Sequence, residues 1–405
     1  MSERIVGKLR DAFAGLAVER DAGGLPRVVP EQADDAASVL GLATQEGWKV
    51  RVEGRATWCP PDAPADIAIS TAGLARVVAV SPGDLVATVE AGAGLAAVHR
   101  RLGEEGTWLA WDPPGHPERS IGGIIAAGTA GPLRHRLGPI KDHLLGCTVV
   151  TGDGRIIRPG GTVVKNVAGY DLTRFMAGGF GAFGILTEVH LRLRAAPETD
   201  STLVARGPRD ALTLAGRQLV ESVVDAAAME LLSPALGADP AWSLAVRLVG
   251  TPEGVAAEAT RIGRATEVTW RALAPGEAGT FWDGASRAAL DGAVTVRLGV
   301  LPDGLDDTMD LVTDHLDAGL LSAGAGSGSL RWTGEATLAQ LQALRHALAG
   351  REIPVTLERA PWALRRAFGH FGLYREGVGA LVSRLRDTFD PGRVLQVSLD
   401  AAADA

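Results

Sequence analysis

Short apolar strands alternate with helices and glycine-rich loops in the first half of the chain. Apolar residues at every second position predict strands, and apolar residues at helical spacing predict helices. The clearest strand covers 185–194, where positions 189, 191 and 193 are apolar and the positions between them are polar. The predicted elements are strand 27–30, helix 31–46, strands 48–53, 66–70, 76–80 and 85–91, helix 95–102, strand 107–110, strands 144–151 and 155–158 joined as a hairpin, and strand 185–194.

Helices lengthen and glycine becomes rarer between about 200 and 358, where one order of elements occurs twice. Two β-α-β-β-α-β passes of this kind predict an antiparallel sheet with helices on one face, as ferredoxin-like repeats have. The first pass is strand 201–206, helix 208–222, strands 226–232 and 242–249, helix 251–262 and strand 265–270. The second is strand 293–300, helix 303–316, strands 319–323 and 328–333, helix 336–348 and strand 353–358, and a last helix covers 378–389.

The chain has 405 residues, more than one hydrophobic core usually serves. We therefore expect an α+β protein with a first domain at 1–196, a second at 197–358, and a segment at 359–405 that returns to the first domain. Hydrophobic residues make up 46% and charged residues 22% of the chain, which excludes general disorder. The net charge of −8 argues against a nucleic-acid-binding face.

Metal clusters and membrane spans are not expected in this chain. Cys59 and Cys147 are its two cysteines, too few for a four-thiolate iron–sulfur cluster or a structural zinc site. The N-terminus lacks the apolar stretch of a signal peptide. The longest uncharged stretches, 121–133 and 177–187, are short and rich in glycine, so we expect no transmembrane segment and a cytoplasmic location.

Two glycine patterns match dinucleotide-binding fingerprints in their letters. The G-F-G-A-F-G run at 179–184 lies after a predicted helix and before a strand, which is the reverse of the order in a Rossmann unit. The G-A-G-L-A-A run at 92–97 has a strand before it and a helix after it. A nicotinamide-dependent dehydrogenase built on 92–97 stays open as a minor alternative.

The most informative stretch covers 121–187, which we interpret as glycine-dense turns between strands. Backbone N–H groups in such turns can approach an anion or a flat ring, because no Cβ is in the way. Lys165 and Tyr170 stand close together in K-N-V-A-G-Y-D, although the chain has few lysines and two tyrosines. Asp171 is predicted to cap a helix, and a solvated Lys165 is the structural alternative.

Four segments, in this order, resemble the FAD-binding domain of the vanillyl-alcohol oxidase/p-cresol methylhydroxylase (PCMH-type) family, and within it the FAD-binding E subunits of bacterial glycolate oxidases. They read I-G-G-I-I-A-A-G-T-A-G-P, L-G-P-I-K-D-H-L-L-G-C, V-V-K-N-V-A-G-Y-D-L and G-G-F-G-A-F-G-I-L-T-E-V. The match covers about 27–196, and F-D-P-G-R-V near the end resembles the closing segment of the family. The resemblance implies a two-subdomain FAD-binding domain and a cap domain, with FAD between them.

The resemblance also implies which residues bind FAD. The family's diphosphate loop, usually R-G-G-G-T/S, reads E-G-R-A-T here, and Arg55 is expected to offset the lost glycines. The family's covalent histidine is absent from this loop, which implies noncovalent FAD, and Phe180 stands where the family has Glu. The implied residues are Gly54, Arg55, Ala56, Thr57 and Trp58 in the loop, Pro113, Ile121, Gly122, Gly123, Ala127, Gly128 and Gly131 in the next segment, and Gly181, Gly184 and Ile185 in the last.

The histidine pair that family members use to oxidise hydroxy acids is missing, so catalytic residues stay unassigned. None of the eight histidines lies two residues from another. His370 is the one expected near the junction of cap and FAD, although a packing or surface role is favoured for it. Tyr374 and Arg375 follow it and are weaker candidates for contacting a ligand carboxylate.

The resemblance implies a flavoprotein subunit of a glycolate (2-hydroxy acid) oxidase or dehydrogenase complex, in an electron-transfer or structural role. A sister FAD subunit would oxidise the substrate, an Fe–S subunit would pass electrons on, and partners would supply any contact with the inner membrane. One alternative is a self-sufficient FAD-dependent oxidoreductase of a small hydroxy acid or alcohol. Another is a non-enzymatic scaffold subunit that has lost FAD.

Overall fold

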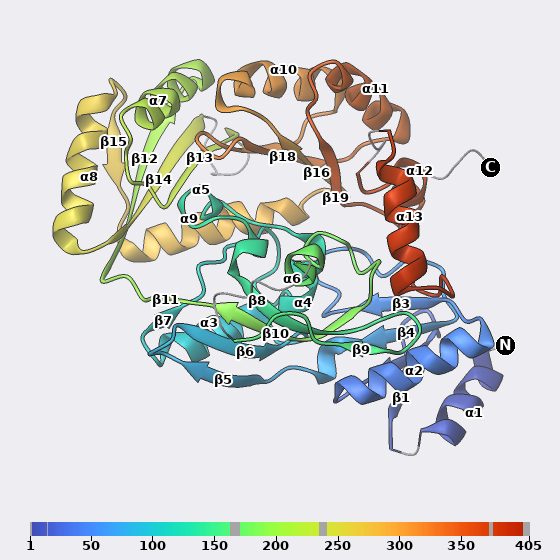
Figure 1. The fold of residues 1–405 in the computed structure, drawn as a ribbon. Coiled ribbons are helices and arrows are strands. Elements are labelled where there is room, and N and C mark those ends of the chain that lie inside the picture. Colours follow the sequence, from blue (N-terminus) through green and yellow to red (C-terminus); the bar gives the residue numbers. More distant parts are fainter. Residues whose placement is uncertain (1, 14, 163–170, 235–240, 372–375, 400–405) are drawn as a thin grey trace.

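The computed structural model describes residues 2–13, 15–162, 171–234, 241–371 and 376–399. The elements form two layers (Figure 1). An N-terminal region with two main sheets lies below a cap built on one large sheet, and a long helix near the C-terminus stands beside both layers. We call these layers the N-terminal region and the cap.

The first sheet of the N-terminal region has the order β1-β2-β4-β3. Its strands β2, β4 and β3 are parallel, and β1 is antiparallel to β2. Helix α2 starts at a capping box and ends at Gly47 in the left-handed conformation, and its apolar face packs on this sheet. The elements are α1 (Ser2–Ala12), β1 (Ala17–Arg20), β2 (Pro26–Val29), α2 (Ala33–Glu46), β3 (Val50–Glu53), β4 (Ile67–Ser70) and η1 (Thr71–Gly73).

The second sheet is antiparallel and has the order β5-β6-β10-β8-β9. Helices α3 and α4 pack their apolar residues against it. Its elements are β5 (Val77–Ser81), β6 (Val86–Glu90), α3 (Leu95–Gly103), β7 (Thr107–Trp108), α4 (Ile121–Ala127), α5 (Arg134–Leu137), η2 (Ile140–His143), β8 (Leu144–Val150), β9 (Ile156–Ile157), α6 (Leu172–Phe175), β10 (Ile185–Arg192) and β11 (Arg194–Ala195), where β7 and β11 form a separate pair.

The cap sheet contains two ferredoxin-like units joined edge to edge. Its order is β15-β12-β14-β13-β17-β18-β16-β19, and every neighbouring pair is antiparallel. The units meet where β13 pairs with β17, the second strand of each. The elements are β12 (Thr199–Gly207), α7 (Arg209–Glu221), β13 (Ala228–Leu232), β14 (Trp242–Gly250), α8 (Pro252–Ala265), β15 (Trp270–Ala272), α9 (Pro275–Arg287), η4 (Ala288–Leu290), β16 (Val294–Gly299), η5 (Pro302–Gly304), α10 (Leu305–His315), β17 (Leu320–Gly324), β18 (Ser329–Gly334), α11 (Leu338–Ala349) and β19 (Val355–Arg359).

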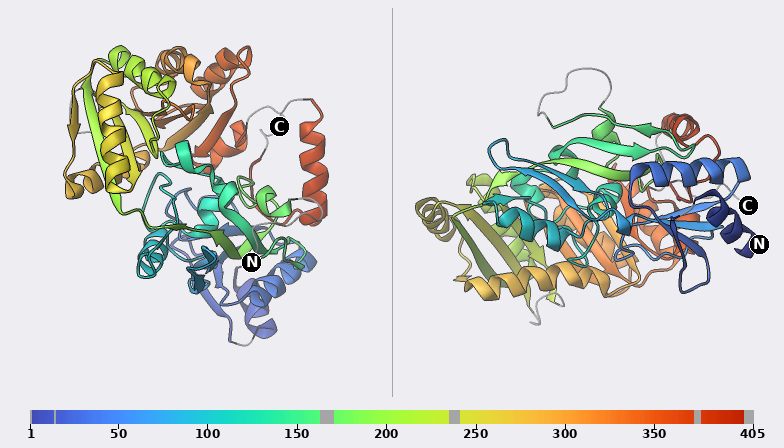
Figure 2. Two further views of the ribbon diagram at one scale, coloured as in Figure 1. Left: turned by 60° about the vertical axis from the view of Figure 1, so that its left-hand side comes forward. Right: turned by 90° about the horizontal axis from the view of Figure 1, so that it is seen from below.

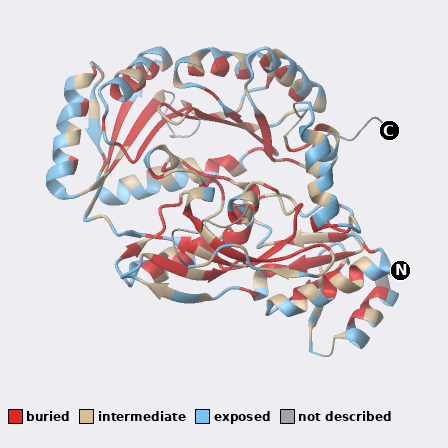
Figure 3. Cartoon of the chain, in the orientation of Figure 1, coloured by how far each residue is buried: buried red, intermediate tan, exposed pale blue. Residues whose placement is uncertain are grey.

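The two faces of the cap sheet differ in polarity. Helices α7, α8, α10 and α11 cover the outer face, where alternate strand residues form an apolar core (Figures 1 and 3). The inner face turns toward the N-terminal region and carries polar residues such as Arg331 and Glu358. Helix α9 lies on this inner side, between the cap sheet and the N-terminal region in Figure 1 and along one edge of the molecule in the right-hand view of Figure 2. The interface between the layers is therefore polar where the sheet is bare.

The last segment connects the two layers again. Helix α12 (Trp362–Phe368) follows β19, and α13 (Val378–Phe389) runs down the side of the molecule. Phe389 packs into the core of the second sheet, and the backbone of Val394 pairs with Val50 of β3. None of the helices in the part of the chain that the structure describes is long and apolar enough to cross a membrane.

The predicted α+β class and the antiparallel cap sheet with outer helices are confirmed, whereas several local predictions differ. The strand predicted at 265–270 lies at Trp270–Ala272, because α8 continues to Ala265. Residues 121–127 were expected in a glycine turn but form α4, because Ser120 caps the helix and its isoleucines point into the core. Helix α9 lies in a stretch without a predicted element, and it has no fully buried residue to give a clear apolar stripe. Helix α1 and strand β1 precede the first predicted strand.

Candidate functional site

The loop after β3 presents a row of unpaired backbone N–H groups. The parallel pairing of β3 with β4 ends at Glu53, and Ala56 then adopts a left-handed conformation with φ of 52°. The backbone N–H groups of residues 55–58 donate to none of the described residues. A left-handed residue that turns successive N–H groups to one side forms an anion-binding concavity. The loop is therefore suited to a phosphate or diphosphate.

Replacing Ala56 by glycine is expected to stabilise the protein. The left-handed conformation costs a residue with a Cβ about 1–2 kcal/mol, and glycine avoids most of that strain. The entropy that glycine gains in the unfolded chain offsets part of this, so we expect a net gain of roughly 0.5–1 kcal/mol. Thermal unfolding of the flavin-free chain measures it, with Ala72→Gly as a control at a position without positive φ. A lower melting temperature for A56G would contradict the strain.

Two small cavities lie beside this loop, and we call them the glycine cavities. One has a volume of about 170 Å³ and is lined by residues 54–58, by Gly123 and Ala127 of α4, and by Arg119. The other, of about 100 Å³, is lined by Gly122, Gly123, Gly181, Gly184 and Ile185. Both cavities share Gly54 and Phe180, so they are neighbouring parts of one hollow. Most of the residues implied by the family resemblance thus lie together.

Gly54 and Gly181 show why glycine is needed around this hollow. A Cβ on Gly54 would lie 2.1 Å from Oγ of Ser120, so glycine lets the loop approach the start of α4. Gly181 has φ of 81°, and a Cβ there would meet no atom within 4 Å. The hollow has free space beside Gly181, whereas the protein itself is closely packed at Gly54. Bare backbone of this kind allows a bound group to lie directly against the chain.

Four implied residues lie outside the glycine cavities. Pro113 borders a larger cavity, which is described below. Ile121 is fully buried in the core of the second sheet. Gly128 packs against the backbone of Gly178, and Gly131 packs against the carbonyl of Asp112, where a Cβ would be only 1.8 Å from the oxygen. Ile121, Gly128 and Gly131 thus have structural roles.

Glu53 does not place an uncompensated charge at the loop. Its carboxylate is buried and accepts a hydrogen bond from Nε of Arg51 at 2.7 Å. Nε of Arg27 lies 3.5 Å from the other carboxylate oxygen. Arg55 is paired with Glu118 at 3.6 Å on the rim. The acid that replaces the family's arginine is therefore neutralised by its own sheet.

His370 lines the larger of the two glycine cavities and packs against Phe180 there. It is 3% exposed, and its ring stacks on Phe180 with centroids 3.6 Å apart. Nδ1 lies 2.7 Å from the carbonyl oxygen of Leu357, so it carries the proton and donates to it. Burial lowers the pKa of His370 to about 4, so the ring is neutral at pH 7. Lys165, Tyr170, Tyr374 and Arg375 lie outside the described residues.

The cap holds the loop through hydrogen bonds that sequence reasoning missed. Trp58 donates from Nε1 to the carbonyl oxygen of Glu358 at 3.1 Å, and Nε of Arg359 donates to the carbonyl oxygen of Trp58. Arg365 donates to the carbonyl oxygen of Pro60 at 3.0 Å and to Asp62 at 2.5 Å. We call this set of bonds the loop clamp. It ties the anion-binding loop to the end of the cap.

A cavity of about 650 Å³ lies between the two layers, and we call it the interdomain cavity. Residues of α3 and the 111–117 loop line one side, and the cap sheet and α9 line the other. Gly115 borders this cavity and lies against the ring of Trp58, which borders the glycine cavities. The two spaces thus adjoin at Trp58, whose ring centroid lies 4.3 Å from the guanidinium of Arg119.

The interdomain cavity contains charged groups as well as indole rings. Trp108, Trp111 and Trp282 supply its aromatic surface. Arg247 is bound to Asp200 at 2.5 Å, and Arg331 is bound to Glu358 at 2.8 Å. No group of three or more His, Cys, Asp and Glu side chains placed to hold a metal ion was found among the described residues. The cavity can accommodate an organic molecule with both polar and apolar parts.

Comparisons with known proteins agree with this geometry. Residues 26–160 match a family model described as an FAD binding domain. The glycolate oxidase subunit GlcE of Escherichia coli is 39% identical over 128 residues, 31% of this chain and 37% of that protein. The glycolate oxidase subunit GlcD of Bacillus subtilis is 30% identical over 183 residues, 44% of this chain and 38% of that protein. The matched parts span less than two fifths of these relatives.

A solved structure extends the likeness to the fold as a whole. Alkyldihydroxyacetonephosphate synthase superposes with a TM-score of 0.73 over 97% of this chain and 84% of its own, at 14% identity. The chain therefore has a PCMH-type fold. Within its N-terminal region, residues 26–160 match the model of an FAD binding domain, and part of the chain is similar to glycolate oxidase subunits.

Proposed function

We propose that the chain binds FAD noncovalently and works as a flavoprotein oxidoreductase component for small 2-hydroxy acids. The row of free N–H groups at 55–58 within the matched domain carries this proposal. Those groups would hold the diphosphate, and the bare backbone at Gly123 and Gly181 would lie against the rest of the nucleotide. FAD, when bound, supplies an acceptor for a hydride or for single electrons.

We further propose that the chain acts within a complex. Support comes from its similarity to two glycolate oxidase subunits and from the spacing of its histidines, none of which forms a pair. A sister FAD subunit would oxidise most of the substrate, and an Fe–S subunit would accept electrons. This chain would then transfer electrons or support assembly, and its partners would mediate any contact with the inner membrane.

The interdomain cavity favours a second candidate, a self-sufficient oxidoreductase of a small hydroxy acid or alcohol. A subunit with a purely structural role needs no cavity of about 650 Å³ lined by three acids and three arginines beside the flavin-binding domain. The non-enzymatic scaffold predicts a protein that cannot be reconstituted with FAD. These possibilities differ in flavin content and in activity without partners.

The purified chain is expected to be yellow, or to become yellow on addition of FAD, because the loop keeps its anion-binding groups. The visible absorption spectrum after gel filtration measures the flavin retained. Alone, the chain is expected to reduce a dye with glycolate only slowly, and co-expressed partners should raise the rate. A colourless protein that cannot be reconstituted would support the scaffold, and fast turnover by the isolated chain would support the second candidate.

A further inference from the structure

The interdomain cavity contains a carboxyl group with a fixed position and an unassigned role. Asp112 borders the cavity and is half-buried. Its two carboxyl oxygens accept hydrogen bonds from the backbone N–H of Leu133 at 3.0 and 3.2 Å. No side chain among the described residues donates to it, so the carboxyl group can accept a further hydrogen bond from a molecule in the cavity. The close packing of Gly131 on its carbonyl fixes the backbone of Asp112.

Charged groups of the cap sheet surround this carboxyl group without pairing with it. Arg247 of β14 is bound to Asp200, and Arg331 of β18 is bound to Glu358. Glu230 of β13 is the other acid nearby, and Ser322 donates a hydrogen bond to it. Burial raises the pKa of Asp112 to about 7, against the hydrogen bond from Leu133 and the charges of Arg247 and Arg331. Burial also raises the pKa of Glu230 to about 7, against the hydrogen bond from Ser322 and the charge of Arg331. Asp112 can therefore take up or release a proton near neutral pH.

Two buried polar atoms of this cavity's lining residues have no partner among the described residues. Nε2 of His99 and Nε1 of Trp111 are buried and form no hydrogen bond with the described residues. His99 interacts with the backbone of Leu109, and burial lowers its pKa, so its ring is neutral at pH 7. Unpaired buried polar atoms are rare in folded proteins, and a polar ligand is one way to satisfy them.

We propose that Asp112 is the proton acceptor for the hydroxyl group of a small hydroxy acid bound in the interdomain cavity. The inference rests on the proposed function and deepens its second candidate. The substrate O–H bond breaks and its proton moves to the Asp112 carboxylate, while the C–H bond breaks with its electron pair and a C=O bond forms. FAD, which the backbone N–H groups of residues 55–58 would hold, would supply the acceptor for that hydride. Two electrons and two hydrogens thus leave the substrate, and Asp112 supplies the base that the missing histidine pair would provide.

Asp112→Asn tests this in the full-length, flavin-loaded chain. The amide oxygen still accepts from Leu133, so flavin content and melting temperature should match the wild type. Anaerobic reduction of the bound flavin by glycolate and lactate should slow by about 100-fold or more, since general bases contribute ~10²–10⁴-fold. The matched control is Asp314→Asn, at an exposed acid of α10 that is not among the residues lining the cavity, and this variant should be reduced at the wild-type rate.

A second readout needs no turnover. α-Hydroxyisobutyrate has no hydrogen on its hydroxyl-bearing carbon, so it can bind but cannot lose a hydride. Its hydroxyl group should stabilise the ionised form of Asp112. Calorimetry at pH 7 in two buffers of different ionisation enthalpy should therefore detect more proton release on binding to the wild type than to D112N, where Glu230 is the remaining acid with a pKa of about 7, with affinities within a few-fold.

The outcomes separate this inference from the proposed function. Wild-type reduction rates in D112N, equal proton release in both proteins, or no binding of α-hydroxyisobutyrate would each overturn the role of Asp112, and flavin binding would stand. A chain that cannot hold FAD would refute the proposed function. In that case proton release on binding of α-hydroxyisobutyrate still decides whether Asp112 exchanges its proton with a hydroxy acid.

Discussion

Replacing Glu358 by glutamine is expected to lower the free energy of unfolding by about 3–5 kcal/mol, since it removes one partner of a buried ion pair. The Glu358 side chain is 0% exposed and binds Arg297 at 2.7 Å and Arg331 at 2.8 Å. Without its charge, Arg331 stays buried without a counter-ion. Urea unfolding followed by tryptophan fluorescence measures the change, because Trp332 lies in the cap core.

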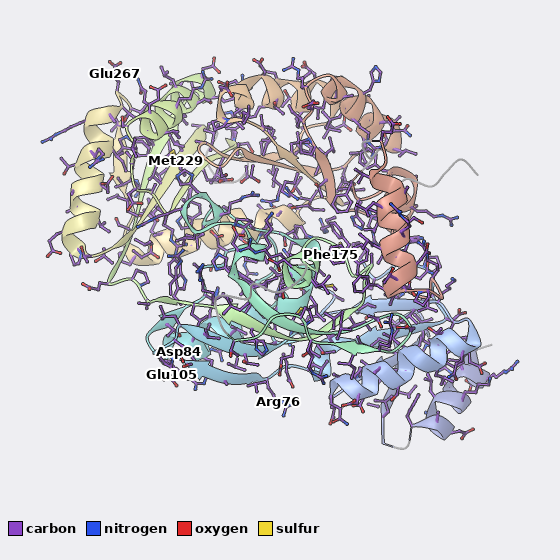
Figure 4. All side chains as sticks on the ribbon, in the orientation of Figure 1. Arg76, Asp84, Glu105, Phe175, Met229 and Glu267 are labelled. Atoms are coloured by element: carbon purple, nitrogen blue, oxygen red, sulfur yellow. The ribbon has the colours of Figure 1, made fainter. Side chains whose placement is uncertain are left out.

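The same carboxylate gives the prediction a pH signature. Burial alone would raise the pKa of Glu358, but Arg331 and Arg297 lower it to about 2 from 4.5. This stability is therefore complete above pH 4.5 and is lost as the pH falls toward 2. E358Q should lose less stability over that window than the wild type. Glu267→Gln, at an exposed residue on the rim of the cap (Figure 4), is the control, and an equal loss in both variants would contradict the buried pair.

Replacing Arg365 by alanine is expected to raise the dissociation constant of FAD by about 10- to 100-fold, or roughly 1.4–2.8 kcal/mol. Arg365 is buried, and its bonds to Pro60 and Asp62 hold the loop that contains the free N–H groups. Without them the loop samples other conformations, and FAD must order it on binding. Fluorescence titration of the flavin-free chain with FAD measures the effect.

Arg366 provides the matched control for the loop clamp. It is the next residue on α12 but is exposed, so Arg366→Ala should bind FAD like the wild type. Asp62→Asn should weaken FAD binding in the same direction as R365A, and the double variant should add little to it, because both changes break one contact. Equal FAD affinity in R365A and the wild type would show that the N-terminal region shapes the loop alone.

Most of the fold could be predicted from the sequence because apolar and polar residues alternate clearly along its strands. In β18, Leu330 and Trp332 point into the outer core and Arg331 points to the inner face, so the period of two is visible in the letters. Helix α13 has the predicted bounds, since Gly377 precedes it and Asp390-Pro391 ends it. Helix α4 was missed because its glycines are read as turns, whereas Gly122 allows the helix to pack closely on Ala91.

The residues of the candidate site could be predicted only in those segments of the sequence that resemble the family. Residues 54–58 and the glycines near 122 and 181 do come together, because each lies in a segment with a recognisable pattern. The loop clamp could not be predicted from the sequence, since Asp62 and Arg365 are about 300 residues apart and neither lies in a recognisable motif. Asp112 carried a weak signal, an acid before two prolines, but its surroundings depend on cap strands far along the chain.

The junction between β13 and β17 makes the cap nearly symmetric about a local twofold axis. Each half contributes the corresponding strand there, and Leu231 pairs with Ala323 at the centre. Glu230 from one half and Ser322 from the other meet on the inner face. At this junction each ferredoxin-like unit contributes one strand, so a molecule bound against β13 and β17 contacts both units. A cap with two similar units can thus form a single binding site, and a change in the angle between the halves would alter that site first.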